Sequence, residues 1–359
     1  MYKRQILYKL DQIKMCKKIA IYGAGKIGVN FAKICIKNKI NIECFIDTFK
    51  DGRSGNLKIL TFDHLINTTN FDCIIIASSL WDEVEDKLLF NNIKNFFILS
   101  NDLVYQSTDL KSLGSFIFKK NILPKLQIVK KYFKGETKIF FNYLIEMHFN
   151  KNQDKLFEFL KYSKRIAPPY VDFINYLGQN ITIIDGGIAD GKETLGFFKK
   201  FNNPIVYAFE PFIKTVNFNN FILNNIPLDL IKVRAEALWK KDEILNFEIK
   251  KNSPTTSNIT NKGNFKVKGV KIDSFVKYNR IKSVQLIKLD IEGAEYEALC
   301  GAKNTIKKHK PYLAISIYHK KEHLYQITVY LKKLNPEYEF KIVFYTTTFI
   351  DTILYAIPK

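Results

Sequence analysis

Two stretches of this sequence run from a short apolar strand pattern directly into a glycine-rich turn. Residues 18–28 are KIAIYGAGKIG, and residues 181–191 are ITIIDGGIADG. A helical pattern follows each turn. Glycines let the backbone pass close to a ligand, and the start of the following helix presents free N–H groups. The sequence therefore predicts two strand–turn–helix units of the kind that binds nucleotides in α/β folds.

Further apolar runs surround both units and alternate with helical patterns. Such alternation is typical of parallel sheets covered on both faces. We expect strands at residues 18–22, 42–46, 73–77 and 96–99 in the first half and at 181–184, 205–209, 231–233, 286–289 and 313–317 in the second. Residues 340–345 and 352–356 are expected to close the second sheet as an antiparallel hairpin.

This pattern divides the chain into three regions. We expect a Rossmann-like domain over 1–102, a helical segment over 103–178 and a second Rossmann-like domain over 179–359. The middle region lacks strand-like runs and carries aromatic-rich amphipathic stretches such as residues 132–162. The predicted fold class is therefore α/β, with two doubly wound domains joined by a helical segment.

Cysteine usage and hydropathy limit the cellular compartment. The five cysteines are scattered without CxxC spacing, which favours reduced thiols over a disulfide framework or a zinc site. The N-terminus has no apolar core of a secretory signal, and no apolar run approaches the roughly 20 residues of a membrane-spanning helix. We therefore expect a cytoplasmic protein. Peripheral contact with a membrane and the oligomeric state are left open.

The formal net charge of the chain is +21. A basic surface raises the local concentration of anionic partners such as nucleotide-sugars, lipid-linked phosphates or nucleic acid. The lysines are spread along the whole chain without an arginine-rich tract, which favours lysine-rich solvated faces over a specific polyanion site. No RNA-binding module or aromatic-basic platform is evident, so we expect no nucleic-acid partner.

Acidic residues follow three of the expected strands in the second half. Asp185 ends the first strand, Glu210 ends the next, and Asp290 follows the strand at 286–289. Ligands of open α/β sheets lie beyond the carboxyl ends of the strands, so these carboxylates should converge on one crevice. A carboxylate at Glu210 is well placed to accept hydrogen bonds from two ribose hydroxyls.

Seven ordered motifs between residues 181 and 358 resemble the FkbM family of methyltransferases. They are DGGIADG at 185–191, YAFEP at 207–211, KIDSF at 271–275, KLDIEGAE at 288–295, ALCGA at 298–302, AISIYH at 314–319 and LYA at 354–356. The resemblance implies a class I methyltransferase fold with S-adenosylmethionine as cofactor. The expected cofactor-binding residues are Asp185, Gly186, Gly187, Gly191, Glu210, Ala237 and Asp290. Residues 344–348 (FYTTT) lack the basic or His-Tyr step of the family. If that step contacts the acceptor, the substrate of this enzyme differs from those of its relatives.

The KLDIEGAE motif supplies the candidate catalytic carboxylates. It looks like the LD-x-D loop of the macrolide-sugar O-methyltransferases, in which the first carboxylate binds Mg²⁺ and the second is the proposed base. Carried over, Asp290 would bind a metal or position the acceptor, and Glu292 would be the base. Those enzymes complete the metal site with an Asp-Asp step where this chain has Tyr318-His319. A divalent metal therefore stays open, and His319 can act as the base itself. Glu295 either belongs to the site or complements the dipole of the next helix.

We predict transfer of a methyl group to a sugar hydroxyl of a surface glycan or of its nucleotide-activated precursor. A hydroxyl is a poor nucleophile and needs a base or a metal. The alternatives are a non-catalytic nucleotide-sugar-binding or regulatory protein and a nucleic-acid methyltransferase. Residues 167–170 (APPY) are similar to a step of the N6-adenine methyltransferases, but alanine replaces its hydrogen-bonding first residue. We interpret this step as a proline turn leading into a helix.

The first unit carries a G-x-G-x-x-G turn, with an aspartate at the tip of the next strand, and this combination fits the dinucleotide fingerprint. The predicted site consists of Gly23, Gly25, Lys26, Ile27, Gly28, Asp47 and Ser78. The unit also looks like the small N-terminal domains of sugar acyltransferases, which hold a nucleotide-sugar. A nucleotide-sugar, a nicotinamide cofactor and a scaffold without ligand remain as alternatives.

Overall fold

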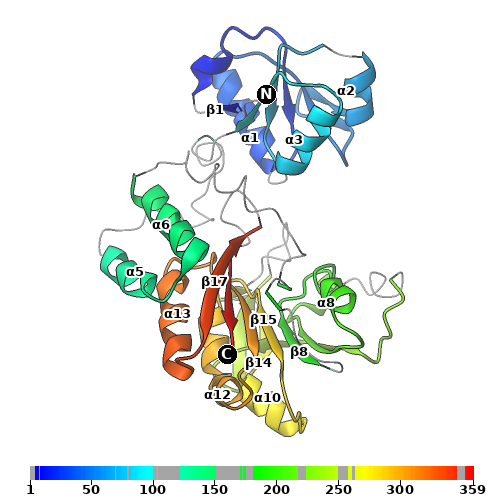
Figure 1. The fold of residues 1–359 in the computed structure, drawn as a ribbon. Coiled ribbons are helices and arrows are strands. Elements are labelled where there is room, and N and C mark those ends of the chain that lie inside the picture. The colour runs from blue at the N-terminus through cyan, green and yellow to red at the C-terminus, as the bar shows by residue number, and fades with distance from the viewer. Residues whose placement is uncertain are drawn as a thin grey trace. The chain divides into compact units, whose positions relative to one another are not determined.

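The structure is a computed structural model of the chain. It describes residues 5–7, 9–68, 70–78, 81–99, 103, 122–150, 170–171, 173–174, 181–216, 224–249, 258–260, 263–345 and 352–359. They fall into two compact units, one within residues 1–115 and one within residues 116–359 (Figure 1).

The N-terminal unit contains a seven-stranded sheet with helices between its strands. Its elements are β1 (Ile6–Leu7), η1 (Leu10–Ile13), β2 (Ile19–Tyr22), α1 (Lys26–Lys37), β3 (Ile42–Asp47), β4 (Gly52–Ser54), β5 (Leu57–Thr61), α2 (Phe62–Thr68), β6 (Cys73–Ile76), α3 (Trp81–Phe90) and β7 (Phe96–Leu99). The strand order is β1-β7-β6-β2-β3-β5-β4. Among these strands, only the pairing of β4 with β5 is antiparallel. Strands β2 and β6 are buried at every position, as expected for central strands covered on both faces.

The C-terminal unit contains a second seven-stranded sheet and a smaller four-stranded one. Its strands are β8 (Thr182–Gly186), β9 (Ile205–Phe209), β10 (Ile231–Arg234), β11 (Glu236–Leu238), β12 (Glu243–Glu248), β13 (Asn258–Ile259), β14 (Phe265–Val270), β15 (Leu286–Leu289), β16 (Tyr312–Ser316), β17 (Glu339–Phe344) and β18 (Thr352–Ile357). Its helices are α5 (Leu123–Lys130), α6 (Gly135–Asn150), α8 (Leu195–Lys200), η3 (Ile213–Thr215), α10 (Ile272–Tyr278), α11 (Glu295–Cys300), α12 (Lys303–His309) and α13 (His323–Leu334).

The large sheet of the C-terminal unit has the order β10-β9-β8-β15-β16-β18-β17. Its first five strands are parallel, whereas β18 pairs antiparallel with both β16 and β17. The predicted closing hairpin is therefore confirmed. The α/β class predicted from the sequence is confirmed as well. Because β9, β8 and β15 are neighbours, the residues that follow these three strands meet at one edge of the sheet.

The four-stranded sheet, in the order β11-β14-β12-β13, was not predicted from the sequence. One residue separates its first strand, β11, from β10, and the sheet buries a small core of Ala237, Leu245, Phe247 and Val267. Its strands are short and bury only part of each face, so their apolar pattern is weaker than that of the central parallel strands. This sheet matters for function because it forms one wall of the cavity described below.

Helices α5 and α6 lie in the part of the chain for which helical structure is expected. Both pack on the C-terminal unit, α5 against α13 and α6 against β17 (Figure 1). Leu126, Phe133 and Phe141 join the core of that unit. Residues 151–169 lie outside the described residues, and the boundaries 102/103 and 178/179 stay predictions. Among the described residues, no helix combines the length and apolar character that crossing a bilayer requires.

Candidate active site

A cavity of about 420 Å³ opens at the carboxyl ends of the central parallel strands of the C-terminal unit. Three segments that follow strands line it: Gly187–Asp190 after β8, Glu210 after β9 and Asp290–Glu292 after β15. The small sheet contributes Ala237 and Phe247. The volume falls in the range of small-molecule sites, and the mixture of apolar walls with a few carboxylates is typical of them.

The glycine turn after β8 is shaped by contact with the loop after β15. Gly187 has a φ of +76°, and a Cβ atom there would lie 1.7 Å from the carbonyl oxygen of Asp290. The backbone N–H of Gly187 donates to Phe209 at 2.9 Å, and that of Asp290 donates to Gly186 at 3.0 Å. Only glycine permits this close approach, so the turn fixes the distance between two walls of the cavity.

Asp185, at the end of β8, lies beneath the turn and not in the cavity wall. Its carboxylate is fully buried, accepts a hydrogen bond of 2.7 Å from Thr194, and pairs with the ammonium group of Lys288 at 3.1 Å. Lys288 also donates to the carbonyl oxygen of Gly187. Burial disfavours the charged ammonium, but the carboxylates of Asp185 and its neighbours outweigh burial and raise the pKa of Lys288. This buried ion pair supports the turn from below.

Glu210 presents its carboxylate to the cavity from the end of β9. It accepts hydrogen bonds from the backbone N–H groups of Phe212 at 3.0 Å and Ala189 at 3.3 Å. Burial raises its pKa, although the two amide donors act against this effect. Each carboxylate oxygen accepts one of these bonds and keeps a further lone pair. The residue can therefore accept bonds from a ligand.

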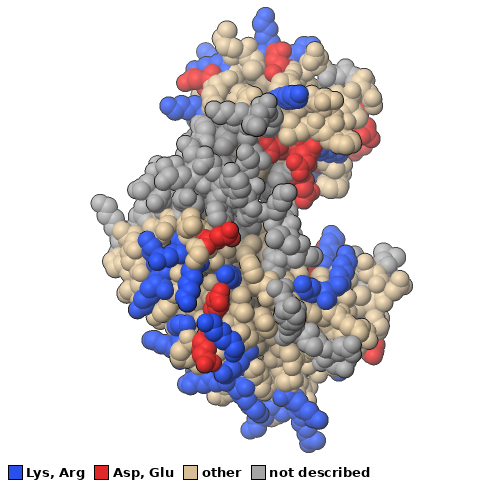
Figure 2. Space-filling model, in the orientation of Figure 1, with Lys and Arg blue, Asp and Glu red and all other residues tan. Residues whose placement is uncertain are grey.

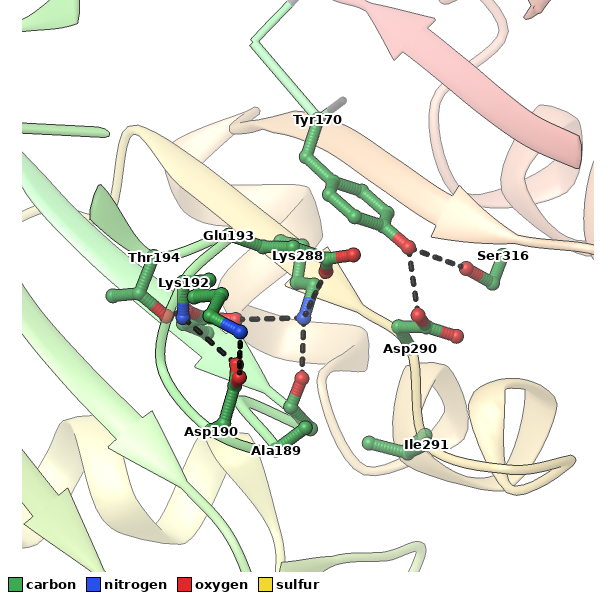
Figure 3. Close-up of polar contacts among 12 residues, drawn as sticks. Tyr170, Ala189, Asp190, Lys192, Glu193, Thr194, Lys288, Asp290, Ile291 and Ser316 are labelled. Atoms are coloured by element: carbon green, nitrogen blue, oxygen red, sulfur yellow. Dashed lines mark hydrogen bonds and ion pairs between the residues drawn. The ribbon is translucent and has the colours of Figure 1, made fainter. Parts of the chain in front are cut away.

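Two tyrosine hydroxyls hold the carboxylate of Asp290. Tyr170 donates to Oδ2 at 2.7 Å, and Tyr318 donates to Oδ1 at 3.1 Å. The Tyr170 hydroxyl also lies 3.2 Å from that of Ser316, and its ring lies over the ammonium group of Lys288, 4.9 Å from the centroid (Figure 3). Burial raises the pKa of Tyr170 well above its usual value, so the hydroxyl stays a donor. Asp290 is thereby fixed at the cavity edge.

His319, which follows β16, lies among three carboxylates. Its Nδ1 atom donates to Glu295 at 2.8 Å, and its Nε2 atom lies 3.6 Å from both Asp290 and Glu292. Burial disfavours the charged imidazole, but the carboxylates outweigh it and raise the pKa of His319 well above the usual value. Burial likewise disfavours the carboxylate of Glu295, yet His319 and His323 hold the pKa of Glu295 well below its usual value. A protonated imidazole cannot accept a proton, which argues against His319 as the base in this state.

Comparison with known families identifies the domain that contains this cavity. The family model for the methyltransferase FkbM domain matches residues 178–347. This part of the chain is an FkbM methyltransferase domain. A further family model, for the C2185-like N-terminal domain, matches residues 15–99. The cofactor of the FkbM domain is S-adenosylmethionine, as predicted.

A solved structure is similar to this chain in fold. The methyltransferase FkbM from Methylobacillus flagellatus KT is 18% identical, with a TM-score of 0.58 over 99% of this chain and 94% of that chain. A putative caffeoyl-CoA O-methyltransferase from Staphylococcus aureus is 12% identical, with a TM-score of 0.30 over 61% of this chain and 98% of that chain. A phosphoethanolamine N-methyltransferase 2 from Haemonchus contortus, in complex with S-adenosyl-L-methionine, is 9% identical, with a TM-score of 0.27 over 91% of this chain and 80% of that chain. No curated protein matches this chain.

The FkbM domain brings together part of the residue set predicted from the sequence. Gly187, Glu210, Ala237, Asp290 and Glu292 line the cavity, and His319 contacts two of them. The remaining three, Asp185, Gly186 and Gly191, are buried and do not line it. At Gly186, a Cβ atom would lie 2.9 Å from side-chain atoms of Leu238 and Leu289, so this glycine serves packing.

The sequence missed Tyr170, which lies before the matched family region. The sequence predicts a proline turn leading into a helix at residues 167–170 (APPY). Tyr170 lies in a turn with a φ of +70°, residues 167–169 lie outside the described residues, and the described residues 171, 173 and 174 are not helical. The backbone N–H of Tyr170 donates to the hydroxyl of Tyr355 on β18 at 3.0 Å. Spacing could not reveal the contact with Asp290, because that residue lies 120 residues further along the chain. Lys288 and Thr194 were missed for a similar reason, since a buried lysine on an apolar strand gives no sequence signal of its partner.

The glycine turn of the N-terminal unit is built for close packing. A Cβ atom at Gly23 would lie 2.6 Å from the carbonyl oxygen of Ala77 and 3.7 Å from the Cβ atom of Ser78, and one at Gly28 would lie 1.9 Å from the carbonyl oxygen of Gly23. The carboxylate of Asp47 accepts backbone N–H groups of Ala24 at 2.8 Å, Phe49 at 2.9 Å and Lys50 at 3.2 Å. Lys26 and Ile27 begin α1. A nucleotide ligand here stays a prediction.

Proposed function

We propose that the FkbM domain transfers a methyl group to a sugar hydroxyl of a surface glycan or of its nucleotide-activated precursor. The observation that carries this proposal is the position of two carboxylates, Asp290 and Glu292, on the wall of the cavity that also contains Glu210. One cavity can thus hold a nucleoside at one carboxylate and a hydroxyl at the other two.

The donor half of the cavity suits a ribose-containing ligand. Glu210 would accept hydrogen bonds from the ribose hydroxyls, and the close passage of the backbone at Gly187 leaves room beside it. When bound, S-adenosylmethionine supplies an electrophilic methyl group. The chain itself contributes binding and orientation, which account for a large part of the barrier in transfers between two bound substrates.

The acceptor half suits a hydroxyl group. Asp290 is oriented by Tyr170 and Tyr318 and can accept a hydrogen bond from the acceptor. Glu292, whose side chain is 28% exposed, takes the proton of the attacking hydroxyl. His319 lies 3.6 Å from each of these carboxylates and offsets their charge. Neighbouring hydroxyls of a sugar ring would bind such a paired carboxylate site better than a lone alcohol does.

The surface charge is compatible with a phosphate-bearing acceptor. On the face of the C-terminal unit that Figure 2 shows, lysine and arginine side chains are spread over the described residues and not collected in one stripe. This distribution favours general attraction of anionic sugars over a track for nucleic acid. The cysteines of the described residues are free thiols, which supports our placement of the reaction in the cytoplasm.

The test is incubation of the purified full chain with labelled S-adenosylmethionine and a panel of nucleotide-sugars, surface glycans and RNA, followed by mass spectrometry of the products. We expect methylation of a sugar, and loss of turnover in Asp290→Asn and Glu292→Gln with donor binding retained. Labelled RNA would favour the nucleic-acid alternative. Failure of calorimetry to detect donor binding would favour a non-catalytic scaffold.

A further inference from the structure

One ring nitrogen of His319 is left without a hydrogen bond at the edge of the cavity. Among the described residues, the Nε2 atom is buried and has no hydrogen-bond partner, and the side chain is only 9% exposed. The nearest polar atoms are Oδ1 of Asp290 and Oε1 of Glu292, each 3.6 Å away. This separation exceeds hydrogen-bond distance. A buried polar atom without a partner is rare and needs an explanation.

The other ring nitrogen is held in a fixed direction. Nδ1 of His319 donates to Oε1 of Glu295 at 2.8 Å, and Glu295 is fully buried. The same oxygen accepts the backbone N–H groups of Ile291 at 2.9 Å and Gly293 at 3.3 Å. Glu295 thus binds the far side of the ring and directs Nε2 toward Asp290 and Glu292. A cation bound at Nε2 would replace the proton that these carboxylates otherwise hold on the imidazole. Histidines that bind metals are oriented by a carboxylate in this way.

We propose that Nε2 of His319 and the carboxylates of Asp290 and Glu292 bind a divalent metal cation, with Glu295 as the orienting partner of the histidine. Metal–ligand bonds of about 2.1 Å place two ligands of a tetrahedral ion roughly 3.4 Å apart. The observed separations of 3.6 Å are close to that value. The part-exposed side chain of Glu292 can adjust its rotamer to complete the set.

The surrounding charge favours a cation at this position. Asp290, Glu292 and Glu295 all lie near the ring. Asp290, Glu295 and His319 each offer one possible ligand atom, and these atoms lie within 4.8 Å of one another, whereas Glu292 is outside this group and joins it only after a change of rotamer. Mixed imidazole and carboxylate ligands suit first-row divalent ions such as Mn²⁺, Fe²⁺, Co²⁺ and Zn²⁺. Because Asp290 and Glu292 also line the cavity, an open coordination position would face the acceptor. The chemical role, polarisation of the acceptor hydroxyl, rests on the proposed function. The binding of the metal does not.

Cobalt is the probe, because Co²⁺ bound to nitrogen and oxygen ligands absorbs visible light. The full chain is stripped with EDTA and titrated with Co²⁺ by calorimetry and by absorption spectroscopy, without donor or acceptor. We expect one equivalent per chain. His319→Gln should abolish it, and Glu295→Gln should weaken it by about 10- to 100-fold, the range for an orienting partner. His64→Gln, which removes an exposed histidine of the N-terminal unit, is the matched control and should bind as the natural chain does.

The natural chain alone decides the matter if a variant fails to fold. Absence of stoichiometric Co²⁺ binding, or binding that survives His319→Gln, overturns the proposal. It would mean that His319 forms only ion pairs with its carboxylate neighbours. Donor binding measured in EDTA separates this outcome from failure of the proposed function. A chain that binds Co²⁺ but not S-adenosylmethionine would contradict the methyl transfer and leave the metal site standing.

Discussion

The two glycine turns of this protein share a sequence pattern but use their strand-tip carboxylates differently. After β2 and β3, the carboxylate of Asp47 accepts three backbone N–H groups and ties its own loop to the glycine turn. After β8 and β9, the carboxylate of Glu210 accepts two and lines a cavity of about 420 Å³. A carboxylate has about four lone-pair positions, so the backbone donors leave one free at Asp47 and two at Glu210, one on each oxygen. The comparison teaches that local backbone donors set how many bonds a carboxylate at a strand tip can accept from a ligand.

The largest contrast is expected between two glycines, Gly187 and Gly25. In Gly187→Ala, the new Cβ would overlap the carbonyl oxygen of Asp290 at 1.7 Å, so the free energy of unfolding should fall by about 4 kcal/mol or more. In Gly25→Ala, the Cβ meets no atom within 4 Å, and the loss at this helix cap should be at most about 1 kcal/mol. Urea denaturation compares the two. Equal losses would mean that the overlap with Asp290 does not determine the cost at Gly187.

The buried ion pair beneath the second turn should give the next largest effect. Lys288→Met leaves the carboxylate of Asp185 buried without its partner, and removal of one member of such a pair costs about 3 kcal/mol. Addition of Asp185→Asn to Lys288→Met should restore part of the loss, because the unpaired charge is then gone. Denaturation of the single and double variants checks this. A double variant less stable than Lys288→Met would contradict the assignment.

The affinity for S-adenosylmethionine should depend on the carboxylate of Glu210 and not on that of Asp47. Glu210→Gln should weaken S-adenosylmethionine binding by about 10- to 100-fold, because hydrogen bonds to a charged acceptor contribute about 1.5–3 kcal/mol. Asp47→Asn is the matched control in the N-terminal unit and should leave donor affinity unchanged. Calorimetry measures both. If the two substitutions weaken binding equally, Glu210 does not contact the donor in the way we propose.

The pH dependence of donor binding follows from the same carboxylate. Burial raises the pKa of Glu210 above its usual value, and only the ionised form accepts bonds from both ribose hydroxyls. Donor affinity should therefore be complete above this raised pKa and fall as the pH drops through it. Glu210→Gln carries no titrating group at this position and should remove that part of the dependence. A pH profile that is the same in both proteins would show that another group controls binding.

The sequence predicted the parallel strands and the strand-tip carboxylates because both depend on local pattern. Runs such as Ile181–Ile184 are apolar at nearly every position, which a strand covered on both faces requires. The small sheet was missed because its strands, β12 for example, bury only alternate positions over a short length. Asp185 was expected in the site, but its partner Lys288 lies 103 residues away and takes it into the interior. Pairings over such distances are set by topology, which spacing alone does not show.

The smallest effect we predict concerns a residue outside the matched family region. Tyr170→Phe removes the hydroxyl that donates to Asp290 at 2.7 Å but keeps the ring over Lys288. The turnover number should fall about tenfold, the equivalent of one hydrogen bond to a charged group, while donor affinity stays the same. Tyr338→Phe removes another buried hydroxyl, bonded to Pro311 at 2.7 Å, and is the control for a simple loss of stability. If both variants lose stability but only Tyr170→Phe loses turnover, the segment before the FkbM domain takes part in orienting Asp290. Unchanged turnover in Tyr170→Phe would confine that role to Tyr318.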